Sequence, residues 1–277
     1  MRLTLDRDRP NLRPAMSKPS FRLTAAERET LASDGFMLRE AVFDAGECSA
    51  IARECEALVS QVAAASRGRK MLAGSYMFEA EREAGTIIKW EPDAPEVVQG
   101  IEPFGHISQS LNEWGLDPRL VDPCKDLVGE DEVMLFTEKL NVKRARQGGQ
   151  IILHQDFPYW ESMTPIAPRI VTAMVFLDDA NLANGCLEVA PGSHRAGKHR
   201  LRDVEGFGSL EMDTDAFDME RLRPLEVKAG DVAFFGAFLV HRSLPNRSPT
   251  DRRALLYSYQ PLGYPHSLEI TKLKRAS

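Results

Sequence analysis

Apolar and polar residues alternate with different periods in the two halves of the chain. In the first half, apolar residues recur every three or four positions, as in helices that bury one face. The segments 24–27 (Thr-Ala-Ala-Glu) and 44–47 (Asp-Ala-Gly-Glu) have the pattern of N-terminal capping boxes, so we expect a helix to begin at each. The first helix should end near Gly35, before a brief strand over residues 36–39. Two further helices are expected over residues 104–114 and 118–128.

Beyond residue 130 the period changes to two, which is typical of strands with one buried face. We expect seven strands there, over residues 134–143, 150–156, 170–178, 186–189, 232–235, 238–244 and 253–259. Two more are expected earlier, over residues 71–78 and 86–91. Helices followed by many short strands predict an α+β fold whose core is a β-sandwich or barrel.

A chain of 277 residues fits one large domain or two small ones and can bury a substantial core. We expect a single domain over residues 21–262, preceded by a flexible lead of residues 1–20 and followed by a C-terminal tail of residues 263–277. Residues 200–222 are polar and rich in Asp and Glu, and they separate two predicted strands. We expect this insert to be a lid over a site or a mobile loop.

Charge and cysteine content narrow the class of partner. The chain has 35 Lys and Arg against 41 Asp and Glu, a net charge of −6, which argues against nucleic acid or an anionic membrane as partner. No apolar run approaches the ~20 residues of a membrane span, and the first residues lack the apolar stretch of a secretory signal. The four cysteines form no CxxC pair, as is typical of reduced thiols. We therefore expect a cytoplasmic monomer or homodimer that acts on a small molecule.

A His-x-Asp pair at the end of a predicted strand is the first candidate for chemistry. In an extended chain, His154 and Asp156 point to one face and Gln155 points to the other. An imidazole and a carboxylate so placed can hold two neighbouring positions of a metal ion. One more imidazole completes the face of two histidines and one carboxylate found in non-haem Fe(II) oxygenases. Because His-x-Asp often occurs by chance, the third ligand decides the interpretation.

His241 is the best candidate for the third imidazole. It ends an apolar, strand-like run over residues 234–240, where an imidazole can project rigidly into the mouth of a barrel. The alternative is a buried histidine that only forms hydrogen bonds with its neighbours. Surface, packing or turn roles explain the other histidines better: His106, His194, His199 and His266.

A candidate anion site follows His241. Arg252 lies at the start of the next predicted strand, and we expect the chain to return across a hairpin so that Arg252 lies near the metal. Its guanidinium can bind a carboxylate through two parallel hydrogen bonds. Ser243 shares the strand face of His241 and can add a hydroxyl group, whereas Arg253 is expected on the opposite face.

These motifs resemble the phytanoyl-CoA dioxygenase family of Fe(II)- and 2-oxoglutarate-dependent oxygenases, which includes ectoine hydroxylases. The resemblance extends from about residue 24 to 260. It rests on His154-Gln-Asp156 with Trp160, Leu177-Asp-Asp-Ala180, Asn184-Gly-Cys-Leu187, Pro191-Gly-Ser-His194, and His241-x-Ser243 with Arg252. It implies a double-stranded β-helix (jelly-roll, cupin-like) core with the N-terminal helices packed against it. It also implies hydroxylation of a small organic metabolite with O2, and the release of succinate and CO2.

The resemblance implies roles for individual residues. His154, Asp156 and His241 would bind Fe(II), while Arg252 and Ser243 would bind the distal carboxylate of 2-oxoglutarate. Related halogenases have a small residue in place of the carboxylate ligand. Since this chain keeps Asp156, the resemblance favours hydroxylation over halogenation.

Lys143 matches a lysine that contacts the cosubstrate in ectoine hydroxylases. It shares a predicted strand face with Lys139 and Asn141, a polar stripe that would suit a pocket wall. A solvated strand face is the alternative. The chain departs from the family at Met174, where many relatives have Trp.

The sequence gives less information about the substrate. Candidate contacts are Tyr159 and Trp160, just past the predicted ligands, and Lys89 in the irregular stretch. Core packing is the alternative for Trp160, since large aromatic residues are mostly buried. Two other functions also stay open: a cupin-like metal enzyme that uses no 2-oxo acid, and a non-catalytic metal-binding sensor on the same barrel.

Overall fold

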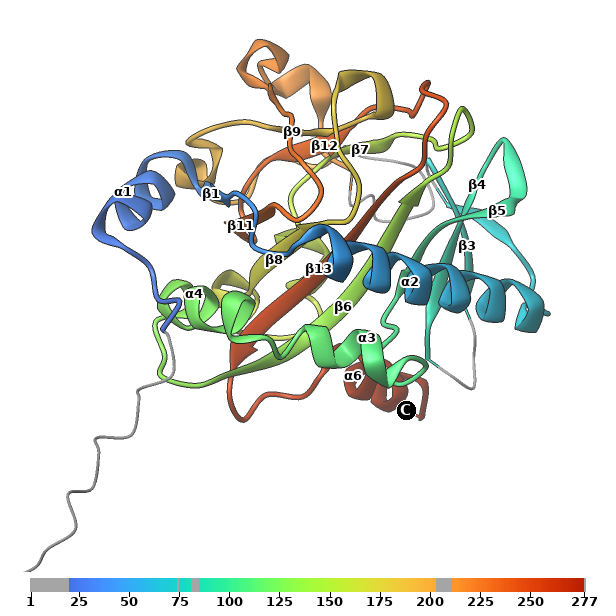
Figure 1. Ribbon diagram of the computed structural model, residues 1–277, viewed down its shortest axis with the longest axis horizontal. Helices are drawn as coiled ribbons and strands as arrows, with labels where there is room; N and C mark the ends of the chain where they lie inside the picture. The colour runs from blue at the N-terminus through green and yellow to red at the C-terminus, as the bar shows by residue number, and fades with distance from the viewer. Residues whose placement is uncertain (1–19, 74, 81–84, 203–210, 277) are drawn as a thin grey trace, which may run out of the picture.

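Two antiparallel sheets form the centre of the computed structural model, which describes residues 20–73, 75–80, 85–202 and 211–276 (Figure 1). Within these residues the larger sheet has nine strands, in the order β1-β11-β8-β13-β6-β5-β4-β3-β2. Their bounds are β1 Phe36–Arg39, β2 Met71–Ala73, β3 Tyr76–Ala80, β4 Ile87–Glu91, β5 Ala94–Glu102, β6 Val133–Lys143, β8 Val171–Phe176, β11 Val232–Gly236 and β13 Arg252–Pro261. The smaller sheet has the order β10-β9-β12-β7, with β7 Ile151–His154, β9 Leu187–Val189, β10 Arg223–Leu225 and β12 His241–Ser243.

Helices cover the outer face of the larger sheet. Figure 1 shows α2 (Ala45–Ala65), α3 (Gln109–Trp114) and α4 (Pro118–Val128) across this face, and α4 contacts β6, β8 and β13. Both predicted capping boxes are present, at Thr24 before α1 (Ala25–Asp34) and at Asp44 before α2. Each cap satisfies backbone N–H groups that the first turn of a helix leaves without partners. None of the helices in the described part of the chain is long and apolar enough to cross a membrane.

Strand β8 shows how the larger sheet separates two cores. All six of its residues are buried. Val171, Ala173 and Val175 pack into the apolar cluster that contains the helices. Met174 and Phe176 point to the opposite face and pack with residues of the smaller sheet, as the alternation of side chains along a strand requires. The predicted α+β class is therefore confirmed, with a core between helices and sheet and a second core between the two sheets.

Several predicted elements differ from the structure in extent. The strand expected over residues 71–78 is two antiparallel strands, β2 and β3, with Ser75 in the turn between them. The helix expected over residues 104–114 begins only at Gln109. Strands β5 and β10 were not predicted. The acidic insert lies partly outside the described residues, and its described part holds short 3-10 turns at Thr214–Ala216 and Met219–Arg221.

The segment expected to be a C-terminal tail contains helix α6 (Ser267–Ala276), which contacts β6. His266 fixes its start, because His266 Nε2 lies 2.8 Å from Glu138 Oε2 and His266 Nδ1 accepts a hydrogen bond from Leu268 N. A ten-residue helix that follows a Gly- and Pro-rich stretch gives little periodic signal, which explains why the sequence analysis missed it.

The expected hairpin between the strands of His241 and Arg252 is wrong. Strand β12, with His241, pairs with β7 and β9 in the smaller sheet, whereas β13, with Arg252, pairs with β6 and β8 in the larger one. The connecting segment crosses from one sheet to the other. The two residues therefore approach the interior from different sheets, not from neighbouring strands of one hairpin.

Candidate active site

Three potential metal ligands meet at the edge of the smaller sheet. Strand β7 ends at His154, β12 begins at His241, and these two residues are direct partners in the strand register. Their ring centroids are 4.2 Å apart. With Asp156, they offer ligand atoms that all lie within 4.8 Å of one another. The three residues that the sequence singled out are therefore close enough to share one ion.

Two details of this geometry correct the sequence analysis. His241 begins a short strand of its own and does not end the run over residues 234–240. Asp156 lies beyond β7, in a helical conformation directly before the short helix α5 (Phe157–Trp160). Pro158 fits the first turn of this helix, because its missing N–H would have no partner there. The carboxylate still comes within 3.8 Å of His154 Nε2.

Hydrogen bonds orient both imidazole rings toward a common point. His154 Nδ1 lies 2.8 Å from Ile152 O and His241 Nδ1 lies 3.0 Å from Leu239 O. A carbonyl only accepts, so each Nδ1 carries the proton and each Nε2 keeps a lone pair for a metal. Burial lowers the pKa of His154 well below its usual value, and the neighbouring His241 contributes a smaller lowering. A neutral imidazole is the form that binds metal, so the donor set fits Fe(II).

Gln155, between the two ligands, points away from them, as predicted. Its side chain is fully buried and donates to Gly197 O (2.8 Å) and Phe238 O (2.7 Å), while it accepts from His199 N (2.8 Å). These bonds tie the segment between His154 and Asp156 to the chain that leads into His241. Sequence analysis gave Gln155 no role, although its orientation was the available signal.

The three ligands line a cavity of about 420 Å³, within the range of roughly 300–1,000 Å³ common for small-molecule sites. Both sheets, α5 and α6 contribute to its wall. Among the predicted site residues, those in the wall are His154, Asp156, His241, Ser243, Arg252, Tyr159, Trp160 and Lys89. Lys143 is the predicted residue that does not belong to the wall.

Arg252 and Ser243 have polar atoms in this interior without partners. Both side chains are 1% exposed, and among the described residues no group hydrogen-bonds Arg252 Nε, Arg252 Nη1 or Ser243 Oγ. Burial lowers the pKa of Arg252 to about 10. A buried cation without a counter-ion is costly, and an anionic ligand would relieve that cost. The arrangement fits a carboxylate held by the guanidinium and the hydroxyl.

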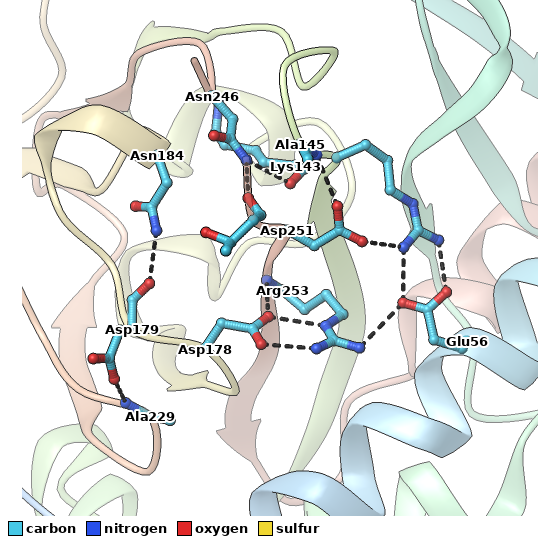
Figure 2. A network of polar contacts seen from close by, with 12 residues as sticks. Glu56, Lys143, Ala145, Asp178, Asp179, Asn184, Ala229, Asn246, Asp251 and Arg253 are labelled. Carbon is cyan, nitrogen blue, oxygen red and sulfur yellow. Dashed lines mark hydrogen bonds and ion pairs between the residues drawn. The ribbon is translucent and has the colours of Figure 1, made fainter. Parts of the chain in front are cut away.

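Arg253, the alternative arginine, lies on the opposite face of β13, as predicted. Figure 2 shows that its guanidinium contacts two carboxylates. It donates to Asp178 through Nε (2.9 Å) and Nη2 (2.7 Å), and to Glu56 through Nη1 (3.2 Å). The hydrogen bonds with Asp178 raise the pKa of Arg253 above its usual value. Arg253 thus fastens β13 to α2, and Arg252 alone of the two enters the cavity.

The segment that delivers Arg252 is held by further polar contacts in Figure 2. Asp251 accepts from Ala145 N (2.7 Å) and from Arg144 Nη1 (2.7 Å). Asn246 donates to Lys143 O (3.0 Å) and to Thr250 O (2.8 Å). Asp251 and Thr250, directly before Arg252, are therefore both held by hydrogen bonds, and these bonds fix the backbone from which the side chain of Arg252 extends.

Lys143 is not part of the cavity wall, although it has the strand face of Lys139 and Asn141. It pairs directly with Arg252 across the sheet, and its Nζ donates to Gly149 O and Leu244 O. Burial and the charge of Arg252 lower the pKa of Lys143 to about 7. In this structure Lys143 holds the backbone just after Ser243, and a contact between its side chain and a cosubstrate stays a prediction. Lys139 and Asn141, on the same strand face, do line the cavity.

The aromatic residues after the ligands form part of the wall. The ring of Tyr159 lies edge-on to that of His154, with centroids 5.8 Å apart. Trp160 packs edge-on against Phe136 (5.6 Å) and is 7% exposed, so it belongs to an apolar cluster as well as to the wall. Both interpretations of Trp160, core packing and a site contact, are compatible with this position.

Some residues of the wall were not predicted from the sequence. Glu102 contributes from β5, an unpredicted strand, and Ser267 and Thr271 contribute from α6. The Asn184-Gly185 motif is structural: Gly185 has φ 72°, and a Cβ there would lie 2.1 Å from Leu244 O, next to Ser243. Only glycine allows this loop to support the chain directly after Ser243.

Comparison with known proteins is consistent with this site. The phytanoyl-CoA dioxygenase (PhyH) family model matches residues 31–254. Phytanoyl-CoA dioxygenase 1 of Oryza sativa subsp. japonica is 36% identical over 109 residues, which are 39% of this chain and 38% of the rice protein. Ectoine dioxygenase of Bordetella parapertussis is 27% identical over 259 residues, 87% of this chain and 76% of that protein.

The crystal structure of EctD from S. alaskensis with 2-oxoglutarate and 5-hydroxyectoine has the same fold. The TM-score is 0.67 at 23% identity, over 92% of this chain and 82% of EctD. The predicted double-stranded β-helix is thereby confirmed. The family model covers most of the chain, including all three potential metal ligands and Arg252. This chain belongs to the phytanoyl-CoA dioxygenase family.

Proposed function

We propose that this protein is an Fe(II)- and 2-oxoglutarate-dependent oxygenase that hydroxylates a small organic molecule and releases succinate and CO2. The observation that carries the proposal is that Arg252 and Ser243 have buried polar atoms without a partner among the described residues, in the same cavity as the ligand triad. A metal-binding sensor or an enzyme without a 2-oxo acid would have no use for a buried cation there. Its relatives include an ectoine dioxygenase and a phytanoyl-CoA dioxygenase.

The residues of this chain divide the work between two regions of the cavity. His154, Asp156 and His241 would hold Fe(II) on one face and leave its other positions open. Arg252 would bind the distal carboxylate of 2-oxoglutarate through Nε and Nη1, with Ser243 Oγ donating to the same group. The bound iron would supply the activation of O2. The apolar wall around Tyr159 and Trp160 would exclude water and receive the substrate.

The test is an anaerobic titration of the metal-free protein with Fe(II) and then with 2-oxoglutarate. We expect a weak visible charge-transfer band when 2-oxoglutarate chelates the iron, and loss of this band at the same concentrations in Arg252→Met. A protein that binds Fe(II) but gives no band at any 2-oxoglutarate concentration would contradict the proposal. That result would favour an enzyme or sensor that uses the metal alone.

A further inference from the structure

One end of the cavity carries charges that the metal and 2-oxoglutarate do not account for. The charged residues in the wall are Lys89, Glu102, Lys139, Asp156, Arg242 and Arg252. Asp156 belongs to the metal triad, and Arg252 faces the expected carboxylate of 2-oxoglutarate. Arg242 is already paired, since its Nε lies 2.7 Å from Glu188 Oε2. Two lysines and one glutamate remain.

Glu102 forms an ion pair with only one of these two lysines, Lys139, and acts on Lys89 from a longer distance. Lys139 Nζ lies 3.1 Å from Glu102 Oε2, and Thr137 Oγ1 donates to the other oxygen of that carboxylate (3.3 Å). Burial opposes the charge on Lys139, but Glu102 and Asp156 more than offset it and raise the pKa of Lys139. This salt bridge is therefore a complete ion pair inside the cavity, and Glu102 has no oxygen left free of a partner.

Lys89 has no such partner. Within the described ranges no carboxylate lies at ion-pair distance from its Nζ, which instead faces the rings of Tyr76 (4.8 Å) and Phe78 (5.6 Å). Burial, and then repulsion by Lys139, lowers the pKa of Lys89 to about 7. A lysine in such surroundings gains most from an anion that brings its own negative charge. The wall of the cavity also includes the apolar side chains of Ile87 and Phe78 and the ring of Tyr159.

We propose that the substrate is a small amphiphilic acid whose single anionic group is bound by Lys89, with its apolar part lying between Lys89 and the metal triad. The proposal rests on the proposed function, because it assigns Arg252 to 2-oxoglutarate and so leaves Lys89 to the substrate. A carboxylate and a phosphonate would present the same anionic oxygens to Lys89. A cationic or neutral substrate would leave Lys89 without an ion-pair partner inside the cavity.

Probes with six carbon atoms and different head groups test the proposal on the full chain, loaded anaerobically with Fe(II) and saturating 2-oxoglutarate so that Arg252 is occupied. The probes are hexanoate, hexylphosphonate, hexan-1-ol and hexylammonium, and binding is measured by calorimetry. A charge-assisted hydrogen bond contributes about 1.5–3 kcal/mol, so we expect an acid to bind about 10- to 100-fold more tightly than the alcohol. Preference for either acid supports the proposal, and the ratio of the two dissociation constants says which acid group fits better.

Variants assign the preference to Lys89. We expect Lys89→Met to lose it, Lys89→Arg to keep most of it, and Glu102→Gln to bind the acid more tightly because the competing carboxylate is gone. Since Lys89→Arg and Glu102→Gln retain volume and polarity, they remain informative if Lys89→Met does not fold. The dissociation constant of 2-oxoglutarate should stay within about twofold in each variant.

Two results would overturn the proposal while the proposed function stands. One is normal binding of 2-oxoglutarate with equal affinity for acid, alcohol and ammonium probes. The other is a Lys89→Met variant that loses affinity for 2-oxoglutarate and keeps its affinity for hexanoate, which would assign Lys89 to the cosubstrate. Failure of 2-oxoglutarate to bind the wild-type iron protein would instead contradict the proposed function.

Discussion

Replacing Arg252 by methionine separates the stability of the fold from the binding of the cosubstrate. Methionine keeps most of the side-chain volume but removes a buried charge whose Nε and Nη1 have no partner in the described structure. Replacing buried ionic groups by well-packed apolar ones is often neutral or stabilising. We therefore expect the protein without ligands to unfold at an equal or higher temperature in Arg252→Met than in wild type.

The rise in unfolding temperature that 2-oxoglutarate causes should be smaller in Arg252→Met than in wild type. At 100 times its dissociation constant a ligand stabilises the native state by about 2.7 kcal/mol. With an unfolding entropy of about 2.1 cal/mol/K per residue, a chain of 277 residues gains about 5 °C. Truncating one partner of a buried charge pair costs about 2–5 kcal/mol of binding, or at least about a 30-fold weaker affinity. At the same concentration the gain in Arg252→Met should be less than about 2 °C.

The assay is anaerobic thermal unfolding with Fe(II) at a fixed concentration, with and without 2-oxoglutarate. Arg253→Met is the matched control, because the neighbouring guanidinium pairs with Asp178 and Glu56 outside the cavity. This variant should unfold at a lower temperature but keep most of the gain of about 5 °C, because Asp251 still fixes the backbone before Arg252. If Arg252→Met kept that gain, or if Arg253→Met lost it, the assignment of the carboxylate site would be wrong.

Three further variants test other parts of the site. Asp156→Ala should abolish 2-oxoglutarate consumption and leave the circular dichroism spectrum unchanged, and full turnover in this variant would contradict the iron assignment. Gly185→Ala should lower the free energy of unfolding by at least about 2 kcal/mol, because a Cβ at φ 72° would lie 2.1 Å from Leu244 O; an unchanged denaturation midpoint would refute this. Lys143→Met should destabilise the fold, since Nζ binds two carbonyls, but change the affinity for 2-oxoglutarate by less than about tenfold. A much larger loss of affinity would make Lys143 a cosubstrate ligand.

The sequence identified side chains better than it predicted the elements that carry them. Gln155 points away from the metal ligands as predicted, although it lies beyond the end of β7. Strand alternation correctly put Arg252 and Arg253 on opposite faces. It also put Lys139 and Asn141 on the cavity face. These inferences needed only the parity of positions along one strand. They did not depend on where the strand begins or ends, so errors of a few residues in strand length left them intact.

Predictions that depended on contacts between segments far apart in the sequence were less successful. The path from His241 to Arg252 was expected to be a hairpin, but strand pairing placed the two residues in different sheets. Lys143 has the parity of Lys139, yet its Nζ turns to carbonyls of Gly149 and Leu244. The positions of those carbonyls follow from loop packing. No periodic pattern in the chain reports such packing.

The contrast between Arg252 and Arg253 connects these observations. The two side chains leave one strand in opposite directions. Arg252 enters the cavity, where its Nε and Nη1 have no partner among the residues that the structure describes, and Arg253 binds two carboxylates. Arg253 and Asp251, the two sequence neighbours of Arg252, fix the backbone on either side of it. Arg252 is thereby held in place inside the cavity. A guanidinium that must be free to bind a ligand cannot also hold itself in place. Neighbouring residues have to supply that rigidity, and the alternation of a strand allows two successive arginines to take the two roles.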